Sequence, residues 1–141
     1  MATGHSRDAV LKVDDPTGTL VDITSDITSV TFSSSKGVVD VTTFGDNYRD
    51  YLAGVADVTI EIEGIYDPAA GKAGSIFAVH AHGTATTSKS YEWYPQGTAS
   101  GKTKASGEFF VTSFPEQSAL DEAVTFGVTL QNTGTVTVGT V

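Results

Sequence analysis

The chain has 141 residues and a formal net charge of −9, with 39% hydrophobic and 18% charged residues. This length fits one domain with a real core. The negative charge repels phosphate and argues against stable nucleic-acid binding, and the absence of cysteine excludes disulfides and thiolate metal sites. The sequence has neither a signal-peptide core at its start nor a run near the ~18 apolar residues of a membrane helix. We therefore expect a protein made in a cytoplasm, without a membrane part.

The first third of the chain predicts short strands between turns. Residues 1–8 are polar and predict a mobile N-terminal arm. The segments "DDPTG" (14–18) and "SSSKG" (33–37) have turn chemistry, with proline and glycine at positions that favour tight turns. Strands are expected before, between and after them, at residues 9–13, 20–24, 28–33 and 39–44.

Two later segments alternate apolar and polar residues most clearly. In 57–67, Val58, Ile60 and Ile62 alternate with Thr59, Glu61 and Glu63, which is typical of a sheet with one solvated face. Residues 123–131 repeat the pattern, with Val124, Phe126, Val128 and Leu130 expected to point inward. Two aromatic-rich strands are expected between these segments, at 91–94 and 107–114.

One helix is expected at about residues 68–82. Asp67 suits its N-cap, Pro68 its first turn and Gly83 its C-cap. The fold class that follows is mainly β: a two-sheet sandwich or squashed barrel with one flanking α-helix. The whole chain, 1–141, forms one domain, and the segment 135–141 is expected to be a C-terminal arm.

Motifs that would indicate catalysis or cofactor binding are weak. The segment "GTASGKT" (97–103) lacks the spacing of a phosphate-binding loop and lies between strands, so it predicts a hairpin connection. His80 and His82 would diverge on a helix, and no third metal ligand is near them. Glu61 and Glu63 share the outer face of a strand, and solvation explains them. We expect no enzyme, cofactor or metal site.

The segment "VTTFGDNYRDYLAG" (41–54) places large apolar residues in a connection. One interpretation is a short helix over the protein's own core, capped by Asp46 and ended by Gly54, with three side chains on one face. The other is a clasp that buries these residues on a neighbouring subunit. The spacing alone favours both equally. The apolar residues concerned are Phe44, Tyr48, Tyr51 and Leu52.

The segment 39–68 resembles the tail tube, or major tail, proteins of long-tailed bacteriophages. The resemblance begins at a strand that ends in Thr-Thr-Phe-Gly, continues through a charged and aromatic loop, and closes with a Thr-Ile-x-Ile-x-Gly strand. The matching positions are Thr42, Thr43, Phe44, Gly45, Arg49, Tyr51, Gly54, Thr59, Ile60, Ile62 and Gly64. A second segment, 108–134, resembles the closing strand pair of the family, with an acidic link through Asp121 and Glu122. Together the resemblance covers roughly residues 10–134.

The resemblance implies a virion structural protein whose subunits form rings of six, stacked into a hollow tube. It implies passage of DNA through the lumen without specific binding, and contact with other tail proteins at the tube ends. A lumen with the same sign of charge as DNA would avoid ion pairs that retain it. The family's long loop is implied to contact the next subunit, which favours the clasp. The expected contact residues are Phe44, Tyr48, Arg49, Tyr51 and Leu52.

An alternative is a non-polymerising β-sandwich binding module, either a virion decoration protein or a carbohydrate-binding domain. Tyr91, Trp93 and Tyr94 would be its ligand platform. Alternation weakens this hypothesis, because Tyr91 and Trp93 share a face and such a pair is more often part of a core. For the tube, we also expect that at least one terminus is mobile in the monomer and ordered by a neighbouring ring.

Overall fold

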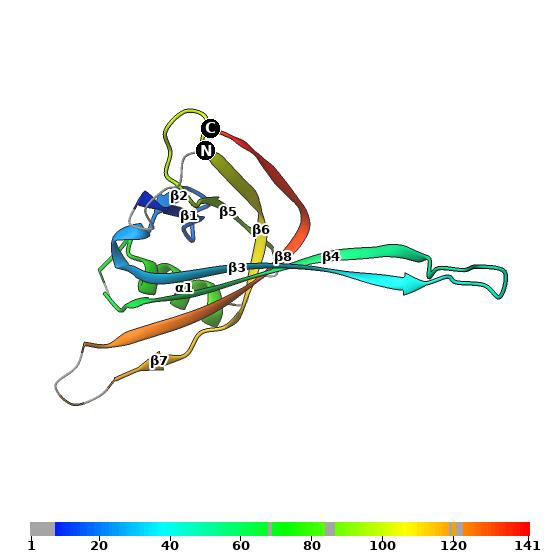
Figure 1. Cartoon of the computed structure of the whole chain (residues 1–141). Coiled ribbons are helices and arrows are strands. Elements are labelled where there is room, and N and C mark those ends of the chain that lie inside the picture. Colours follow the sequence, from blue (N-terminus) through cyan, green and yellow to red (C-terminus); the bar gives the residue numbers. More distant parts are fainter. Residues whose placement is uncertain (1–7, 68, 84–86, 119, 121–122) are drawn as a thin grey trace.

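The computed structural model describes residues 8–67, 69–83, 87–118, 120 and 123–141. In this part of the chain, one antiparallel sheet contains eight strands in the order β2-β1-β5-β6-β8-β4-β3, with β7 paired to β8 outside this path. The sheet curves around the helix α1 (Ala73–His82) (Figure 1). The strands are β1 (Val10–Asp14), β2 (Leu20–Asp22), β3 (Ile27–Asp40), β4 (Tyr51–Ile65), β5 (Lys89–Tyr94), β6 (Thr103–Ser113), β7 (Glu116–Gln117) and β8 (Thr125–Thr140).

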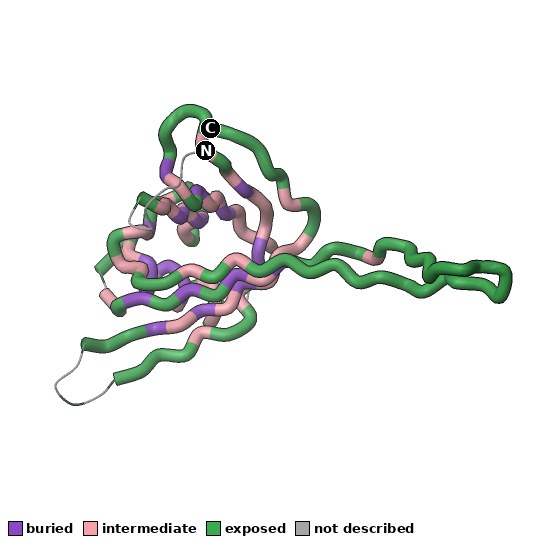
Figure 2. The backbone as a smooth tube through the Cα atoms, in the orientation of Figure 1, coloured by how far each residue is buried: buried purple, intermediate pink, exposed green. Residues whose placement is uncertain are grey.

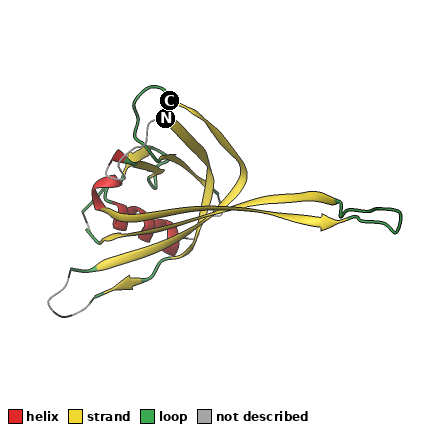
Figure 3. Ribbon diagram, viewed as in Figure 1, coloured by secondary structure: helices red, strands yellow, loops and turns green. Residues whose placement is uncertain are grey.

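The predicted fold class, mainly β with one flanking helix, is confirmed (Figure 3). The strands belong to one continuous sheet instead of two separate ones. A single curved sheet can still enclose a core, because residues on its inner face meet one another and the helix. The buried cluster joins β1, β4, β5, β6, β8 and α1.

The alternating patterns on β4 and β8 are confirmed. Ile60 and Ile62 on β4 are at most 1% exposed, and Phe126, Val128 and Leu130 on β8 are at most 3% exposed. They meet Ile76 and Phe77 of α1 in the same cluster. Val124 differs from its predicted inward position, since it precedes β8 and remains 39% exposed. The side chains on the inner face of the sheet therefore carry the hydrophobic stabilisation of the fold.

The helix begins later than predicted. Lys72 is its N-cap, and the preceding Gly71 has φ of 80°, a left-handed conformation that separates Asp67 from the helix. Asp67 instead accepts a hydrogen bond from the N–H of Ala69 (2.9 Å), which closes a local turn. Pro68, the predicted first helical residue, lies outside the described residues. The first helical N–H, that of Ala73, donates to Asp26 Oδ2 (3.2 Å). Gly83 is the C-cap, as predicted.

The predicted turn at 33–37 is wrong, because β3 runs through it without a break. Ser33–Lys36 pair with Thr59–Ala56 of β4, and the pairing resumes at Val38 opposite Ala53 after a register shift. The two strands form one long hairpin. Its inner half covers the core, and its outer half projects away from the rest of the molecule (Figure 1).

The C-terminal segment is part of the sheet. β8 changes partner along its length: Thr125–Gln131 pair with β4, and the segment from Thr129 to Thr140 pairs with β6. The last residue, Val141, donates its N–H to the carbonyl oxygen of Lys102 (2.8 Å). The mobility of the predicted arm 135–141 stays a prediction. The predicted N-terminal arm, residues 1–8, lies outside the described residues except for Asp8.

Within the described ranges, no helix has the length and apolar character needed to cross a membrane.

Candidate functional site: an exposed hairpin arm

The outer half of the β3–β4 hairpin, residues 35–57, lies in the longest exposed stretch among the described residues, and we call it the hairpin arm. All of its residues are exposed except Gly54, which is partly buried (Figure 2). Six residues of β3, from 35 to 40, span about 20 Å at ~3.3 Å per residue, and the tip, residues 41–50, extends the arm further. A two-stranded ribbon with both faces in water is only marginally stable by itself. This geometry is typical of a segment that another surface covers.

The five predicted contact residues all lie on the hairpin arm. Phe44 is 112% exposed and Tyr48 87%, while Tyr51 and Leu52 are 52% and 60% exposed. The Arg49 side chain is 70% exposed. The alternative interpretation, a short helix over the protein's own core, is wrong, because Tyr51 and Leu52 begin strand β4 and the tip forms no helix. The i, i+3, i+4 spacing of Tyr48, Tyr51 and Leu52 does not reflect a helix, because β4 starts at Tyr51.

Phe44 occupies the apex of a tight turn. The N–H of Asp46 donates to the carbonyl oxygen of Thr43 (3.0 Å), so that Phe44 and Gly45 are the two central residues of a β-turn. Asp46 Oδ2 accepts in return from the N–H of Thr43 (2.9 Å). Two reciprocal bonds fix this turn, and the aromatic ring is held outward by an ordered backbone.

A second set of bonds closes the base of the tip. Arg49 Nη1 lies 2.7 Å from Asp40 Oδ2, and the N–H of Val41 donates to the carbonyl oxygen of Asp50 (2.9 Å). Hydrogen bonds from the Thr42 side chain and backbone, and then the Arg49 guanidinium, hold the pKa of Asp40 below its usual value. Arg49 therefore has a partner within its own hairpin arm, Asp40, which weakens its predicted role in contacting another subunit.

Two glycines allow the strands of the arm to approach at the register shift. A Cβ added to Gly54 would lie 2.9 Å from the carbonyl oxygen of Gly37, closer than real Cβ contacts. The shift between Lys36 and Val38 falls at the same place. β-bulges of this kind increase twist and bend a strand, so this pair sets the direction of the outer arm.

Sequence reasoning missed part of the exposed apolar surface. Val38, Val39 and Val55 are 65%, 58% and 91% exposed. Direct cross-strand partners share a face, which places Val39 with Leu52, and Val38 with Ala53 on the opposite face. Both faces of the arm are therefore apolar in places. Alternation could not reveal this, since a valine that faces water and a valine that faces a core give the same pattern.

The other candidate residues have structural partners. His80 Nε2 lies 2.7 Å from the carbonyl oxygen of Asp14 and its ring packs edge-on against Phe109, while His82 packs against Phe114. The two histidines thus contact different elements. Residues 97–102 lie in the β5–β6 connection, as predicted, and Thr103 begins β6.

The three aromatic residues that the binding-module hypothesis would use as a ligand platform pack against the core or hydrogen-bond within the protein. Tyr91 is fully buried and its hydroxyl donates to Asn132 Oδ1 (2.9 Å). Trp93 packs against the core cluster, and Tyr94 is 5% exposed and donates a hydrogen bond to Glu92. A sugar-stacking platform needs several exposed rings, whereas Tyr91 and Tyr94 are buried and Trp93 alone is partly exposed on this strand.

The sequence matches the family described as phage tail tube protein over residues 3–138. The chain belongs to this family. The match includes the whole hairpin arm and nearly all of the sheet, so it covers the fold and the candidate site together. The protein is therefore a structural component of a phage tail. No curated protein sequence matches the chain.

Solved structures of tails and injection machines share the fold of this tail tube protein. A chain from the tail of an empty gene transfer agent particle, refined with C6 symmetry, is 18% identical with a TM-score of 0.77, over 96% of this chain and 98% of that one. A chain of the SPP1 tail tube is 13% identical with a TM-score of 0.75, over 99% and 80%. A chain from the sheath–tube complex of an extracellular contractile injection system is 15% identical with a TM-score of 0.71, over 99% of this chain and 93% of that one.

Proposed function

We propose that this tail tube protein assembles into hexameric rings that stack into a hollow tube, and that the hairpin arm is the clasp between subunits. Support for the ring comes from family membership and from the C6 symmetry of a structure with the same fold. The single observation that carries the clasp is the exposure of the arm, with Phe44 fully in solvent at its apex. Closed symmetry would satisfy each contact in a ring, and repeated stacking would extend the tube.

The contact residues in this proposal are Phe44, Tyr48, Tyr51 and Leu52, with Arg49 as a minor member. Exposed aromatic anchors are frequent hot spots of protein interfaces, and burying each contributes on the order of 1–3 kcal/mol. The ordered turn at Thr43–Asp46 lowers the entropy lost on docking, because the backbone is fixed beforehand. If the arm packed only on its own subunit, these apolar side chains would be buried there, whereas they are exposed to solvent.

We further propose that DNA passes through the lumen without being bound. Support comes from the formal net charge of −9, which gives the subunit the same sign of charge as DNA. A lumen of that sign would avoid ion pairs that retain phosphate. Other tail proteins would contact the ends of the tube, and we expect no catalytic activity, cofactor or metal.

Negative-stain electron microscopy of the concentrated protein tests the assembly. Rings or tubes are the expected result, and their symmetry can be read from end views. Dispersed monomers at all protein and salt concentrations would contradict the proposal. The same grids prepared with DNA should show no change in tube length or decoration.

A further inference from the structure

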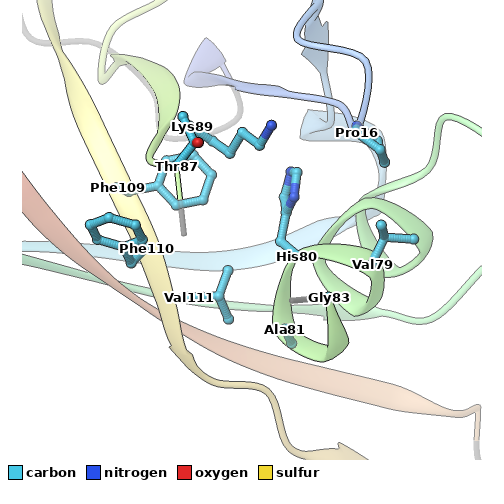
Figure 4. Close-up of a pocket in the computed structure, with 10 residues that line it drawn as sticks. All are labelled: Pro16, Val79, His80, Ala81, Gly83, Thr87, Lys89, Phe109, Phe110 and Val111. Carbon is cyan, nitrogen blue, oxygen red and sulfur yellow. The ribbon is translucent and has the colours of Figure 1, made fainter. Parts of the chain in front are cut away.

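A pocket of about 400 Å³ lies between the end of α1 and the strand β6, and we call it the α1–β6 pocket (Figure 4). Phe109 forms part of its buried wall, Val111 lies on the same face of β6, and Val79 of α1 is 49% exposed. Its described lining residues are Pro16, Val79, His80, Ala81, Gly83, Thr87, Lys89, Phe109, Phe110 and Val111. Half-exposed apolar side chains around a hollow are typical of a binding surface.

We propose that the α1–β6 pocket receives the tip of the hairpin arm from a second copy of this chain, with Phe44 inserted beside Val79 and Val111. This inference rests on the proposed function and adds the receptor that the clasp needs. The occupant is another copy because the tip and α1 lie far apart within one molecule (Figure 1).

The tip has the shape of an insert. Phe44 is at the apex of a turn that two bonds between Thr43 and Asp46 hold in place. The ring has no contact that would need to be broken, since it is fully exposed. An aromatic side chain on an ordered turn can enter an apolar pocket with little loss of conformational entropy.

The charges of the two surfaces are complementary. The tip and its base carry Asp40, Asp46 and Asp50 against one cation, Arg49, which Asp40 already pairs. The described lining of the α1–β6 pocket contains the cation Lys89 and no acidic side chain. Lys89 is thus the one lysine or arginine of this described lining, in a chain with 17 acidic residues and 8 lysines and arginines. Opposite charges at an apolar contact fix its orientation and suppress wrong partners.

A second pocket is the internal competitor. It lies among β1, β3 and β5, has a volume of about 540 Å³, and includes the half-buried Trp93. Its lining has no charged side chain: Ala9, Leu11, Thr24, Ile27, Thr28, Ser29, Val30, Trp93 and Pro95. It could hold an aromatic ring, but it offers nothing for the acidic groups beside Phe44. The charge argument therefore separates the two pockets, and an experiment can do the same.

Thiol crosslinking tests the assignment without background, because the chain has no cysteine. Gly45→Cys places a thiol beside Phe44, in open space and without a positive φ. Val79→Cys places the second thiol on the rim of the α1–β6 pocket. We expect a short bismaleimide to give a ladder of covalent oligomers with the double variant, and at most dimers with either single variant. The matched control is Gly45→Cys with Ser29→Cys, at the competing pocket, which should give no ladder.

Two further variants sharpen the result. Phe44→Ala in the Gly45→Cys/Val79→Cys background should lower the crosslinking yield about tenfold, as loss of an aromatic anchor would. If Val79→Cys itself prevents assembly, Thr87→Cys on the same lining replaces it, and a ladder there supports the proposal equally.

The outcomes separate this inference from the proposed function. Tubes that form with no ladder at Val79 or Thr87, or with a ladder at Ser29 instead, would overturn the α1–β6 pocket and leave the tube intact. Wild-type protein that forms no rings or tubes would overturn both proposals.

Discussion

The two halves of the β3–β4 hairpin both carry large apolar residues but have opposite surroundings. In the inner half, Ile60 is fully buried beneath the helix and sheet, and in the outer half Leu52, on the same strand, is 60% exposed. The pairing of the strands continues from one half to the other through a single register shift. The difference shows that strand pairing and burial are separate properties. The inner half stabilises the fold of the monomer, and the outer half offers surface to a partner.

The largest expected effect comes from truncating the same strand in its two halves. Ile60→Ala should destabilise the monomer by about 2–5 kcal/mol, because it leaves a cavity in the core. Leu52→Ala should change the free energy of unfolding by less than about 0.5 kcal/mol, as expected of an exposed position. Urea unfolding of the two variants measures the contrast. Equal losses would mean that the arm packs on its own core in solution.

The two glycines of β4 sharpen the comparison. A Cβ on Gly64 would lie 2.3 Å from the carbonyl oxygen of Asp26 and 3.0 Å from the ring of Phe126. Gly64→Ala should therefore cost about 1–3 kcal/mol of monomer stability through overpacking. Gly54→Ala meets only Gly37 of the arm, so it should redirect the arm and reduce tube formation while the melting temperature stays near that of the wild type. A lower melting temperature for Gly54→Ala alone would reverse the assignment of the two halves.

Alkaline pH should destabilise the monomer through its core, in which Tyr91 is buried. Burial raises the pKa of Tyr91 to about 12, against about 10 in an unfolded chain. The unfolded chain loses this proton first, so the stabilisation is complete below pH ~10 and is lost as the pH rises to about 12. We expect a loss of about 1–3 kcal/mol between pH 9 and pH 12, measured by urea unfolding.

Tyr91→Phe is the control for the alkaline loss, because it removes the titrating hydroxyl. Tyr94 titrates in the same direction, since its hydrogen bond to Glu92 and its burial raise its pKa to about 12. The control should therefore shrink the loss without abolishing it. An identical pH profile for Tyr91→Phe and the wild type would remove Tyr91 from the explanation.

The smallest expected effect is at the tip. Arg49→Ala removes an exposed ion pair with Asp40, and exposed pairs contribute little. Tube yield should change less than about twofold and melting should not change. Sedimentation of tubes at low and high salt measures this. A complete loss of tubes would show that Arg49 pairs with a neighbouring subunit instead of with its own tip.

The sequence predicted the inner fold well because burial leaves a signal. One covered face produces the alternation on β4 and β8, and the end of α1 coincides with Gly83. The start of α1 was missed because its first N–H is bound by Asp26, which lies 47 residues away in the sequence. No local pattern records such a contact.

The outer arm was predicted in its residues and missed in its conformation. The segment 33–37 has turn chemistry, yet it continues as a strand because cross-strand pairing with β4 overrides local preference. The aromatic residues of the tip were correctly identified as unusual for a loop, and their helical spacing was misleading. Exposure on both faces has no period of its own, so Val38 and Val55 carried no signal.

The central claim is that the hairpin arm makes contacts between subunits, whereas the part of the sheet that covers the core stabilises the fold of the monomer. The most direct measurement is thermal melting of the Phe44→Ala/Tyr51→Ala monomer beside its tube yield by electron microscopy. Both side chains are more than half exposed, so the account predicts a melting temperature close to that of the wild type. Tube yield should fall strongly, because every ring repeats the lost contact. A monomer that melts far lower, or tubes that form in undiminished yield, would contradict the account.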